Sequence, residues 1–225
     1  RIFLEPGAEV EHSVLNASSG PIYIGANALV MEGCLIRGGF ALGAHGVVKM
    51  GAKIYGPTTA GPYCKIGGEI NNSVLFGYSN KGHDGFLGNA VLGEWCNLGA
   101  DTNNSNLKNN YAKVRLWNYA SGRFDQTGLQ FCGLVMGDHS KSAINTMFNT
   151  GTVVGVNCNI FASGFPRNFI PSFSWGGTSG FSTYLPEKAF EAARVAMQRR
   201  GVDFTAEDEA LMLEVFEISK TYRKA

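Results

Sequence analysis

The residues best suited to chemistry gather between positions 83 and 106. They form the runs His83-Asp84-Gly85-Phe86-Leu87-Gly88, Leu98-Gly99-Ala100-Asp101-Thr102 and Asn103-Asn104-Ser105-Asn106. A histidine can take up a proton near neutral pH, because its pKa lies close to that range. We therefore expect a functional site in this segment, although a histidine taken by itself is more often a solvated or turn residue than a catalyst.

The other three histidines, His12, His45 and His139, do not extend this cluster. His139 could be a second functional histidine, but a structural role in a loop is the favoured interpretation. The spacing of the four histidines is not that of a metal-ligand set, so a zinc enzyme is disfavoured and no metal is expected.

Composition excludes several classes of protein. The chain has 225 residues, a net charge of +1 and 16% charged residues, which does not suggest binding to nucleic acid or to a membrane surface. Its apolar runs are shorter than the ~20 residues that cross a bilayer. The five cysteines are an odd number without a CxxC pair, which favours a reducing compartment, the cytoplasm. Because the chain begins at Arg1 without a visible signal peptide, we expect a piece of a longer protein.

A six-residue period organises most of the chain. Every sixth residue is aliphatic in the series Ile24, Val30, Ile36, Leu42, Val48, Ile54, Ala60 and Ile66. Four residues after each of these comes a residue that is mostly small. This pattern predicts an all-β fold, a left-handed parallel β-helix of hexapeptide repeats in which three hexads make one coil.

The period is interrupted twice. It slips between Asn71 and Leu87, returns as Leu92, Leu98 and Thr102, and breaks at an insertion over residues 117–132 before resuming at Met136. Four cysteines fall on the small position and are expected to have a packing role: Cys34, Cys64, Cys96 and Cys158.

We expect three parts in the chain. Residues 1–165 form the β-helix with its insertion loop, and residues 166–184 form an irregular cap rich in aromatic, Gly and Ser residues. Residues 185–225 form two helices, the first beginning at Pro186 and stopping at Gly201, the second capped by Thr205. This helical hairpin is expected to cover the coil or a neighbouring subunit.

The segment from Ser79 to Thr102 resembles the acetyltransferase half of the bifunctional N-acetylglucosamine-1-phosphate uridyltransferase/glucosamine-1-phosphate N-acetyltransferase family. That family carries a catalytic histidine in N-H-L-T-Y-x-G-D-A-x-x-G, followed by N-I-G-A-G-T and C-N-Y-D-G. The spacing from His83 to Asn97, Ala100 and Asn106 matches without a gap, and Glu69 falls on the glutamate of an upstream V-E-x-K-K-S motif. The similarity extends from about Lys53 to Gly164.

The resemblance implies a role for each matching residue. His83 would be the general base that deprotonates a sugar amine, Glu69 would orient it, and the Ala100 amide would stabilise the thioester oxygen. The other implied positions are Asn97 and Asn106 for substrate, Ala162 for the coenzyme A channel and Lys113 near the phosphate. Acetyl-CoA would be the co-substrate, with no covalent enzyme intermediate.

Several positions depart from the family pattern. The lysine that holds the sugar phosphate in the family falls on Asn71, its tyrosine after the catalytic histidine on Phe86, and the tyrosine of C-N-Y-D-G on Leu107. A serine near the coenzyme A thiol falls on Ile144. The phosphate could be held instead by Lys53, Lys81 or Lys113, and Arg167 could contact a coenzyme A phosphate.

Three functions remain open. In the first, the chain is an acetyl-CoA-dependent N-acetyltransferase acting on an amino-sugar phosphate, as a homotrimer. In the second, it is a non-catalytic β-helix that trimerises and regulates a sugar-1-phosphate nucleotidyltransferase domain preceding Arg1, as in bacterial sugar nucleotidyltransferases that this chain resembles. In the third, it is a sugar O-acetyltransferase. We favour the first.

Overall fold

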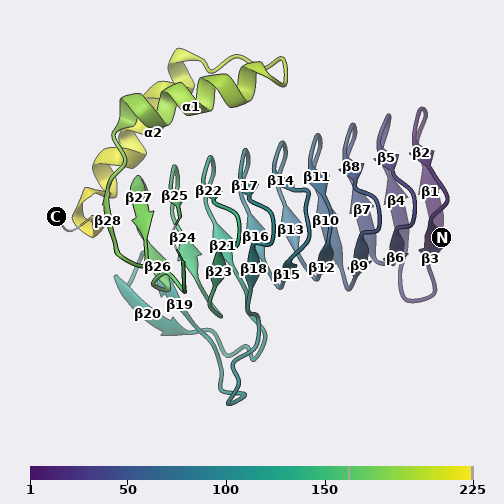
Figure 1. Ribbon diagram of the computed structural model, residues 1–225, viewed down its shortest axis with the longest axis horizontal. Coiled ribbons are helices and arrows are strands. Elements are labelled where there is room, and N and C mark those ends of the chain that lie inside the picture. Colours follow the sequence, from purple (N-terminus) through teal and green to yellow (C-terminus); the bar gives the residue numbers. More distant parts are fainter. Residues whose placement is uncertain (162, 224–225) are drawn as a thin grey trace.

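The computed structural model describes residues 1–161 and 163–223. Its main body is a left-handed parallel β-helix, followed by two helices at the C-terminal end (Figure 1). Short strands stack along the axis in three faces, as the six-residue period predicts. The predicted fold class is therefore confirmed.

The three faces are named here in the order in which the chain visits them. Face 1 contains β1 (Ile2–Leu4), β4 (Ile22–Ile24), β7 (Phe40–Leu42), β10 (Thr58–Ala60), β13 (Val74–Leu75), β16 (Val91–Leu92), β21 (Val135–Met136), β24 (Val153–Val154) and β26 (Phe169–Ile170). Face 2 contains β2 (Glu9–Val10), β5 (Leu29–Val30), β8 (Val47–Val48), β11 (Lys65–Ile66), β14 (Asn80–Lys81), β17 (Asn97–Leu98), β22 (Lys141–Ser142), β25 (Asn159–Ile160), β27 (Ser174–Gly177) and the antiparallel β28 (Gly180–Thr183). Face 3 contains β3 (Val14–Asn16), β6 (Leu35–Arg37), β9 (Lys53–Tyr55), β12 (Glu69–Asn71), β15 (Phe86–Gly88), β18 (Asn103–Asn104) and β23 (Met147–Phe148).

The core is the column of side chains that each strand directs into the coil. Successive side chains of a strand point to opposite sides, so a two-residue strand encloses one position and a three-residue strand can enclose two. One enclosed column of face 1 consists of Ile24, Leu42, Ala60, Leu75, Leu92, Met136 and Val154, all fully or almost fully buried; Ile22 and Phe40 are enclosed beside it. Burial of these apolar side chains is the main source of stability for the coil.

The slip in the period has a simple cause. After Ile66 the next enclosed residue is Ile70 in β12, four positions on instead of six, and Leu75 follows after five. The sequence pattern assigned Ile70 to a small corner position, whereas the structure encloses it in a strand. The turns before β12 and β13 are shorter than in a regular hexad, but the strands stay in register, and Ile70 pairs with Leu87.

Cysteines fill the cramped corners of the coil. Cys34, Cys64, Cys96 and Cys158 are buried, and all five cysteines are free. Burial raises the pKa of Cys64 to about 11 and that of Cys96 to about 12. These thiols stay protonated near neutral pH, which agrees with the packing role predicted for them.

Face 3 is interrupted between β15 and β18. The two strands are neighbours but belong to separate sheets, because side chains replace the backbone ladder between them. The Asn103 Oδ1 accepts the Phe86 N–H at 2.8 Å, and the Asn104 amide bonds both the N–H and the carbonyl of Gly88. Asn104 is the enclosed residue of β18, six positions after Leu98; Thr102, which the sequence pattern placed in the series, is also buried but lies in the turn before β18.

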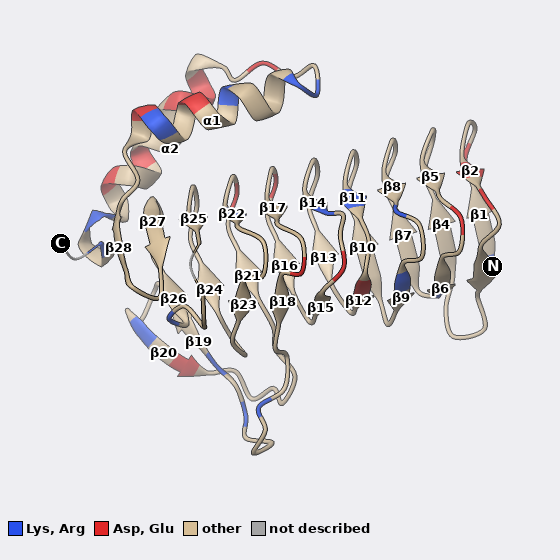
Figure 2. Ribbon diagram, viewed as in Figure 1, with Lys and Arg blue, Asp and Glu red and all other residues tan. Residues whose placement is uncertain are grey.

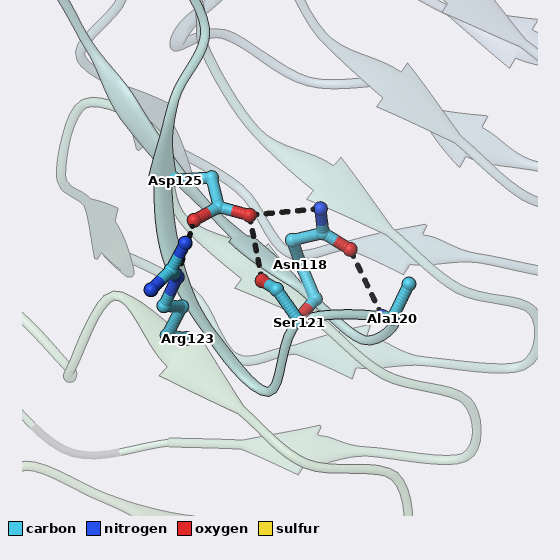
Figure 3. A network of polar contacts seen from close by, with 5 residues as sticks. All are labelled: Asn118, Ala120, Ser121, Arg123 and Asp125. Carbon is cyan, nitrogen blue, oxygen red and sulfur yellow. Dashed lines mark hydrogen bonds and ion pairs between the residues drawn. The ribbon is translucent and has the colours of Figure 1, made fainter.

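The insertion forms a β-hairpin of β19 (Arg115–Asn118) and β20 (Arg123–Gln126). Its turn is organised by Asp125, which accepts hydrogen bonds from Asn118, Ser121 and Arg123 (Figure 3). The bond from Ser121 is the largest cause of the lowered pKa of Asp125. The hairpin packs on the C-terminal coils, where the Trp117 ring stacks on Phe169 with the ring centroids 4.1 Å apart.

The chain ends in α1 (Pro186–Gln198), α2 (Ala206–Ile218) and a short 3-10 helix, η1 (Lys220–Tyr222). Proline begins α1 and Thr205 caps α2 with a capping box to Asp208, as the sequence predicts. Phe173 of the last coil packs with Phe190 and Met212 of the hairpin. α1 thereby extends back over the turns between face 1 and face 2 (Figure 1).

Residues 166–184, expected to be irregular, contain β26, β27 and β28. The first two continue face 1 and face 2 by one more coil. β28 then turns back antiparallel to β27 and leads into α1.

Stacked rings line the corner between face 1 and face 2. His45, Tyr63, Tyr78, Trp95 and His139 follow one another with centroids 4.1–6.1 Å apart. Each occupies the same left-handed position of its turn, with φ between 57° and 60°. The stack ends where Phe204, between α1 and α2, meets His139 edge-on. His139 is therefore a buried structural residue.

We predict that His139 makes the protein sensitive to mild acid. Burial, aided by Lys141 and opposed by Asp208, lowers the pKa of His139 to about 4, and its Nδ1 has no hydrogen-bond partner in the parts of the chain that are described. Between that value and an unfolded pKa of about 6.5 the unfolded chain binds the proton, so stability falls as pH falls. From pH 7 to pH 5 the loss should be about 2 kcal/mol.

The measurement is urea unfolding at both pH values for the parent protein and His139→Phe. The phenyl ring keeps the stack but cannot titrate, so the variant should lose less stability on acidification. Equal losses in the two proteins would remove His139 as the cause.

Candidate active site

His83 lies in the turn between β14 and β15, at the corner between face 2 and face 3. Its side chain is exposed. The turn is held between two coils: a Cβ on Gly68 below would lie 2.7 Å from the His83 carbonyl oxygen, and a Cβ on Gly85 would collide with the Thr102 carbonyl above. Gly85 also has φ +110°, which a side chain would oppose. The local sequence therefore needs glycine here to fix the His83 backbone.

A buried lysine, Lys81, stabilises the His83 turn from inside the coil. Lys81 occupies the enclosed position of β14, next to Ile66 of β11, and is 1% exposed. Its Nζ donates to the carbonyl oxygens of Gly67, His83 and Asp84. Burial lowers the pKa of Lys81 to about 8, against the opposing effect of Asp84 and Asp101. Lys81 is thus enclosed and cannot contact a phosphate in solution, contrary to one of the expectations from sequence.

His83 opens into a cavity of about 860 Å³. Asn97 of β17 and Ala100 of the next turn line the same cavity, together with Ile144. Within the described residues the Ala100 N–H has no acceptor, whereas its carbonyl accepts from Asn145. Three of the residues expected at the site therefore share one cavity, with a free amide among them.

The rest of the cavity wall was not anticipated from sequence. It includes the basic residues Lys49, Lys65, Lys141, Arg199 and Arg200. Lys65, Asn80, Asn97 and Lys141 form one outward column of face 2, and the two arginines follow α1. The six-residue period could have revealed the column, but only the folded chain brings α1 to it.

Glu69 lies on the coil below the His83 turn, and its N–H points to the Gly85 carbonyl at 3.4 Å. Its carboxylate accepts a hydrogen bond from the Tyr55 hydroxyl on the next strand of face 3. That bond is the main cause of the raised pKa of Tyr55. Glu69 does not line the His83 cavity within the described residues.

The remaining expected residues lie elsewhere on the coil. Lys53 is exposed in β9, and the Asn71 amide donates to the Tyr55 carbonyl at 3.3 Å. Asn106, at the corner between face 3 and face 1, donates to Asn89 at 2.7 Å. Lys113 is exposed on the segment before β19. None of these lines the His83 cavity in the described parts of the chain.

Arg167 lines a second cavity of about 1170 Å³. That cavity lies between the β19–β20 hairpin and the C-terminal coils, with Arg115 and Lys108 in its wall. The Arg167 guanidinium also lies 5.5 Å from the Phe181 ring centroid. Ala162, expected at the coenzyme A channel, lies outside the described residues.

Among residues 1–161 and 163–223, no group of three or more His, Cys, Asp and Glu side chains could hold a metal ion. In the same residues no helix has both the length and the apolar character needed to cross a membrane.

Comparison with known proteins gives matches of structure only. No protein-family model and no curated protein sequence matches the chain. Among solved structures, the UDP-N-acetylglucosamine acyltransferase LpxA of Bacteroides fragilis 9343 has a TM-score of 0.47 and 14% identity, over 99% of this chain and 82% of that one. The polySia-specific acetyltransferase NeuO has a TM-score of 0.42 and 13% identity, over 81% and 85%. The polysialic acid O-acetyltransferase OatWY has a TM-score of 0.30 and 11% identity, over 81% and 88%.

We predict that Lys81 makes the stability rise in alkaline solution. Its pKa is about 8 in the folded chain and about 10.5 when unfolded, so between these values the unfolded chain holds the proton that the folded chain has lost. This group should add about 2 kcal/mol to the free energy of unfolding between pH 7.5 and pH 10.

The comparison is between the parent protein and Lys81→Met at both pH values, by urea unfolding. Other groups titrate in this range, so the informative quantity is the difference between the two proteins. A parallel pH dependence in both would show that the Lys81 ammonium is not buried.

Proposed function

We propose that the chain is an acetyl-CoA-dependent N-acetyltransferase that acts on an amino-sugar phosphate. The observation that carries the proposal is that His83, Asn97 and Ala100 line one cavity. These are positions at which the chain resembles the family of glucosamine-1-phosphate N-acetyltransferases. The chemistry of a histidine base and a free backbone amide fits acyl transfer without a covalent intermediate.

In the proposed reaction the amine of the sugar attacks the carbonyl carbon of the acetyl thioester. His83 takes the proton that the amine loses as the new C–N bond forms. The Ala100 N–H donates to the thioester oxygen, on which negative charge develops. The C–S bond then breaks, and coenzyme A leaves as a thiol after receiving a proton from the imidazolium of His83.

Glu69 supports this base from the coil below. The resemblance assigns it the role of orienting the imidazole. Its carboxylate is hydrogen-bonded to Tyr55 in the structure, so in this proposal Glu69 exchanges that partner for His83 during the reaction.

We also propose that the chain acts as a homotrimer, as the resemblance implies. The outward column of face 1 is uncharged along its whole length: Phe3, Tyr23, Ala41, Thr59, Val74, Val91, Val135, Val153 and Phe169. Val153 is buried and Phe169 is covered by Trp117 of the hairpin, so the surface open to a partner runs from Phe3 to Val135. The outward columns of the other two faces contain charged residues such as Lys65 and Glu69. Apolar surface of this extent is stabilised when another protein surface covers it.

A trimer would also bring separated residues together. His83 lies at the corner between face 2 and face 3, whereas Asn106 and the Arg167 cavity lie toward the corner between face 3 and face 1. One chain cannot use both regions for one substrate molecule, but packing of neighbouring coils could. In this proposal Asn106, Lys113 and Arg167 serve the cavity of an adjacent subunit.

We also propose a cellular location and a larger enzyme for this chain. The chain would be the acetyltransferase part of a cytoplasmic sugar-nucleotide biosynthetic enzyme of the UDP-N-acetylglucosamine type, joined to a nucleotidyltransferase domain. The five free cysteines suit a reducing compartment.

We predict that His83→Ala lowers kcat/KM for acetyl transfer to glucosamine 1-phosphate by roughly 10²–10⁴-fold, the usual contribution of a general base. The matched control is His12→Ala, because His12 is also exposed and lies at the same corner, between β2 and β3. Coenzyme A release is measured with a panel of amino and hydroxy sugars. Turnover that survives in His83→Ala would remove His83 from the mechanism, and a preference for hydroxy sugars would indicate an O-acetyltransferase.

We predict that Val74→Glu combined with Val91→Glu breaks the trimer, because carboxylates on face 1 would be buried without partners. Light scattering after gel filtration should give three times the 24.2 kDa of the chain for the parent and one chain mass for the variant. Val14→Glu with Leu35→Glu, equally apolar and exposed on face 3, is the control and should stay trimeric. A parent protein of another mass would contradict the proposed assembly.

A further inference from the structure

Five basic residues line the His83 cavity, and one of them, Lys141, donates to the His139 carbonyl. Of the other four, Lys49 follows β8 and Lys65 lies in β11, whereas Arg199 and Arg200 follow α1. Figure 2 shows basic residues at this end of α1, above the coils of face 2. No carboxylate is among the described residues that line the cavity, and none of the four cations forms an ion pair within the described chain.

Lys49 reaches along the axis toward His83. It follows β8, two coils below the His83 turn, at the same corner of the coil. Its Cβ lies 3.0 Å from the point where a Cβ of Gly67 would be, and its Cγ lies 4.0 Å from that of Gly82. The two glycines therefore leave room for the lysine stem, which runs across both coils toward the residue next to His83.

Arg200 is held in position by a chain of amides. Arg200 donates to the Asn80 Oδ1 at 3.1 Å, and Asn80 donates in turn to the Asn97 Oδ1 at 3.4 Å. Asn97 is a residue already proposed to bind substrate. The end of α1 is thus connected to the floor of the cavity rather than projecting into solvent.

The positive charges around the cavity repel one another. The pKa of Lys65 is lowered, first by Arg200, then by burial, Lys49 and Arg199. Like charges brought together in this way repel one another, and the repulsion is relieved when an anion binds between them. A phosphate offers several acceptor oxygens and a double negative charge, which suits two lysines and two arginines.

We propose that Lys49, Lys65, Arg199 and Arg200 form the binding site for the phosphate group of the acceptor. The inference rests on the proposed acetyl transfer at His83. It assigns the phosphate to residues other than Lys53, Asn71 and Lys113, and it makes α1 a wall of the active site. The acceptor is a sugar carrying a phosphate ester, either a sugar monophosphate or a nucleoside diphosphate sugar.

Proximity favours the acceptor over coenzyme A as the source of the phosphate. Neighbouring strands are ~4.8 Å apart, so Lys65 lies about one coil and Lys49 about two coils from His83 along the axis. In a sugar phosphate only a few bonds separate the amine from the phosphate. In acetyl-CoA the whole pantetheine arm separates the thioester from the phosphates.

The first experiment compares acceptors with and without phosphate. The single variant Lys49→Met and the double variant Arg199→Gln/Arg200→Gln should each raise the KM for glucosamine 1-phosphate by roughly 10–100-fold. This is the effect expected from losing one or two charge-assisted hydrogen bonds to the phosphate. The KM for acetyl-CoA should rise far less than that for glucosamine 1-phosphate, and so should the KM for unphosphorylated glucosamine. Lys188→Gln on α1 and Arg123→Gln on the hairpin are the controls, since both are exposed and neither lines the cavity.

Two kinetic results would overturn the assignment. An equal effect on glucosamine and on glucosamine 1-phosphate would mean that the cations do not recognise phosphate. A rise in the KM for acetyl-CoA alone would mean that they serve the donor. Lys49→Met leaves the contacts of α1 intact, so agreement between the two variants excludes loosening of the helix as the cause. Repeating the series with UDP-glucosamine distinguishes a monophosphate from a nucleoside diphosphate acceptor.

A binding measurement separates this inference from the proposed reaction. Calorimetry with inorganic phosphate, and separately with glucosamine 1-phosphate, is carried out on the parent, His83→Ala and Lys49→Met. Binding should persist in His83→Ala, weaken in Lys49→Met and decrease with added salt. If this pattern holds although no acetyl transfer is detected, the phosphate site stands and the proposed reaction is wrong. If transfer is active but neither probe binds in a Lys49-dependent way, the phosphate site is wrong.

Discussion

The whole structure depends on what can fill the enclosed position of each strand. A three-sided coil has room for only one or two inward side chains per face, and the strands above and below must present compatible neighbours. Aliphatic residues such as Ile66 and Leu98 satisfy this condition simply. A polar residue at such a position must have its hydrogen bonds met inside the coil, because water cannot reach it.

Two of the departures from this pattern occur at the candidate site. Lys81 replaces an aliphatic residue between Ile66 and Leu98, and Asn104 does so above Leu87 on the neighbouring face. The polar groups of both side chains form hydrogen bonds with the backbone: Lys81 bonds the His83 turn, and Asn104 bonds Gly88. An apolar residue at either position would have avoided the free-energy penalty of burying a polar group. We therefore interpret Lys81 and Asn104 as residues that fix the backbone around His83.

This distinction also explains how far the sequence could predict the protein. The period of six reports which side chains are enclosed, and helix caps such as Thr205 are local signals, so the fold and the two helices were predictable. Side-chain partners across coils are not encoded in a period. The bonds of Asn106 to Asn89 and of Tyr55 to Glu69 were not predictable, because residues far apart in the chain become neighbours only after winding.

The contribution of α1 is the part least accessible to sequence. Arg199 and Arg200 are more than a hundred residues from His83, and no repeat relates them to it. Their position follows from Phe173, Phe190 and Met212, which pack the hairpin on the last coil, and from Phe204, which covers the end of the ring stack at His139. Apolar packing at the end of the coil thus sets where the charges of α1 meet face 2. A helical extension that closes the open end of a solenoid can in this way also supply one wall of a site several coils away.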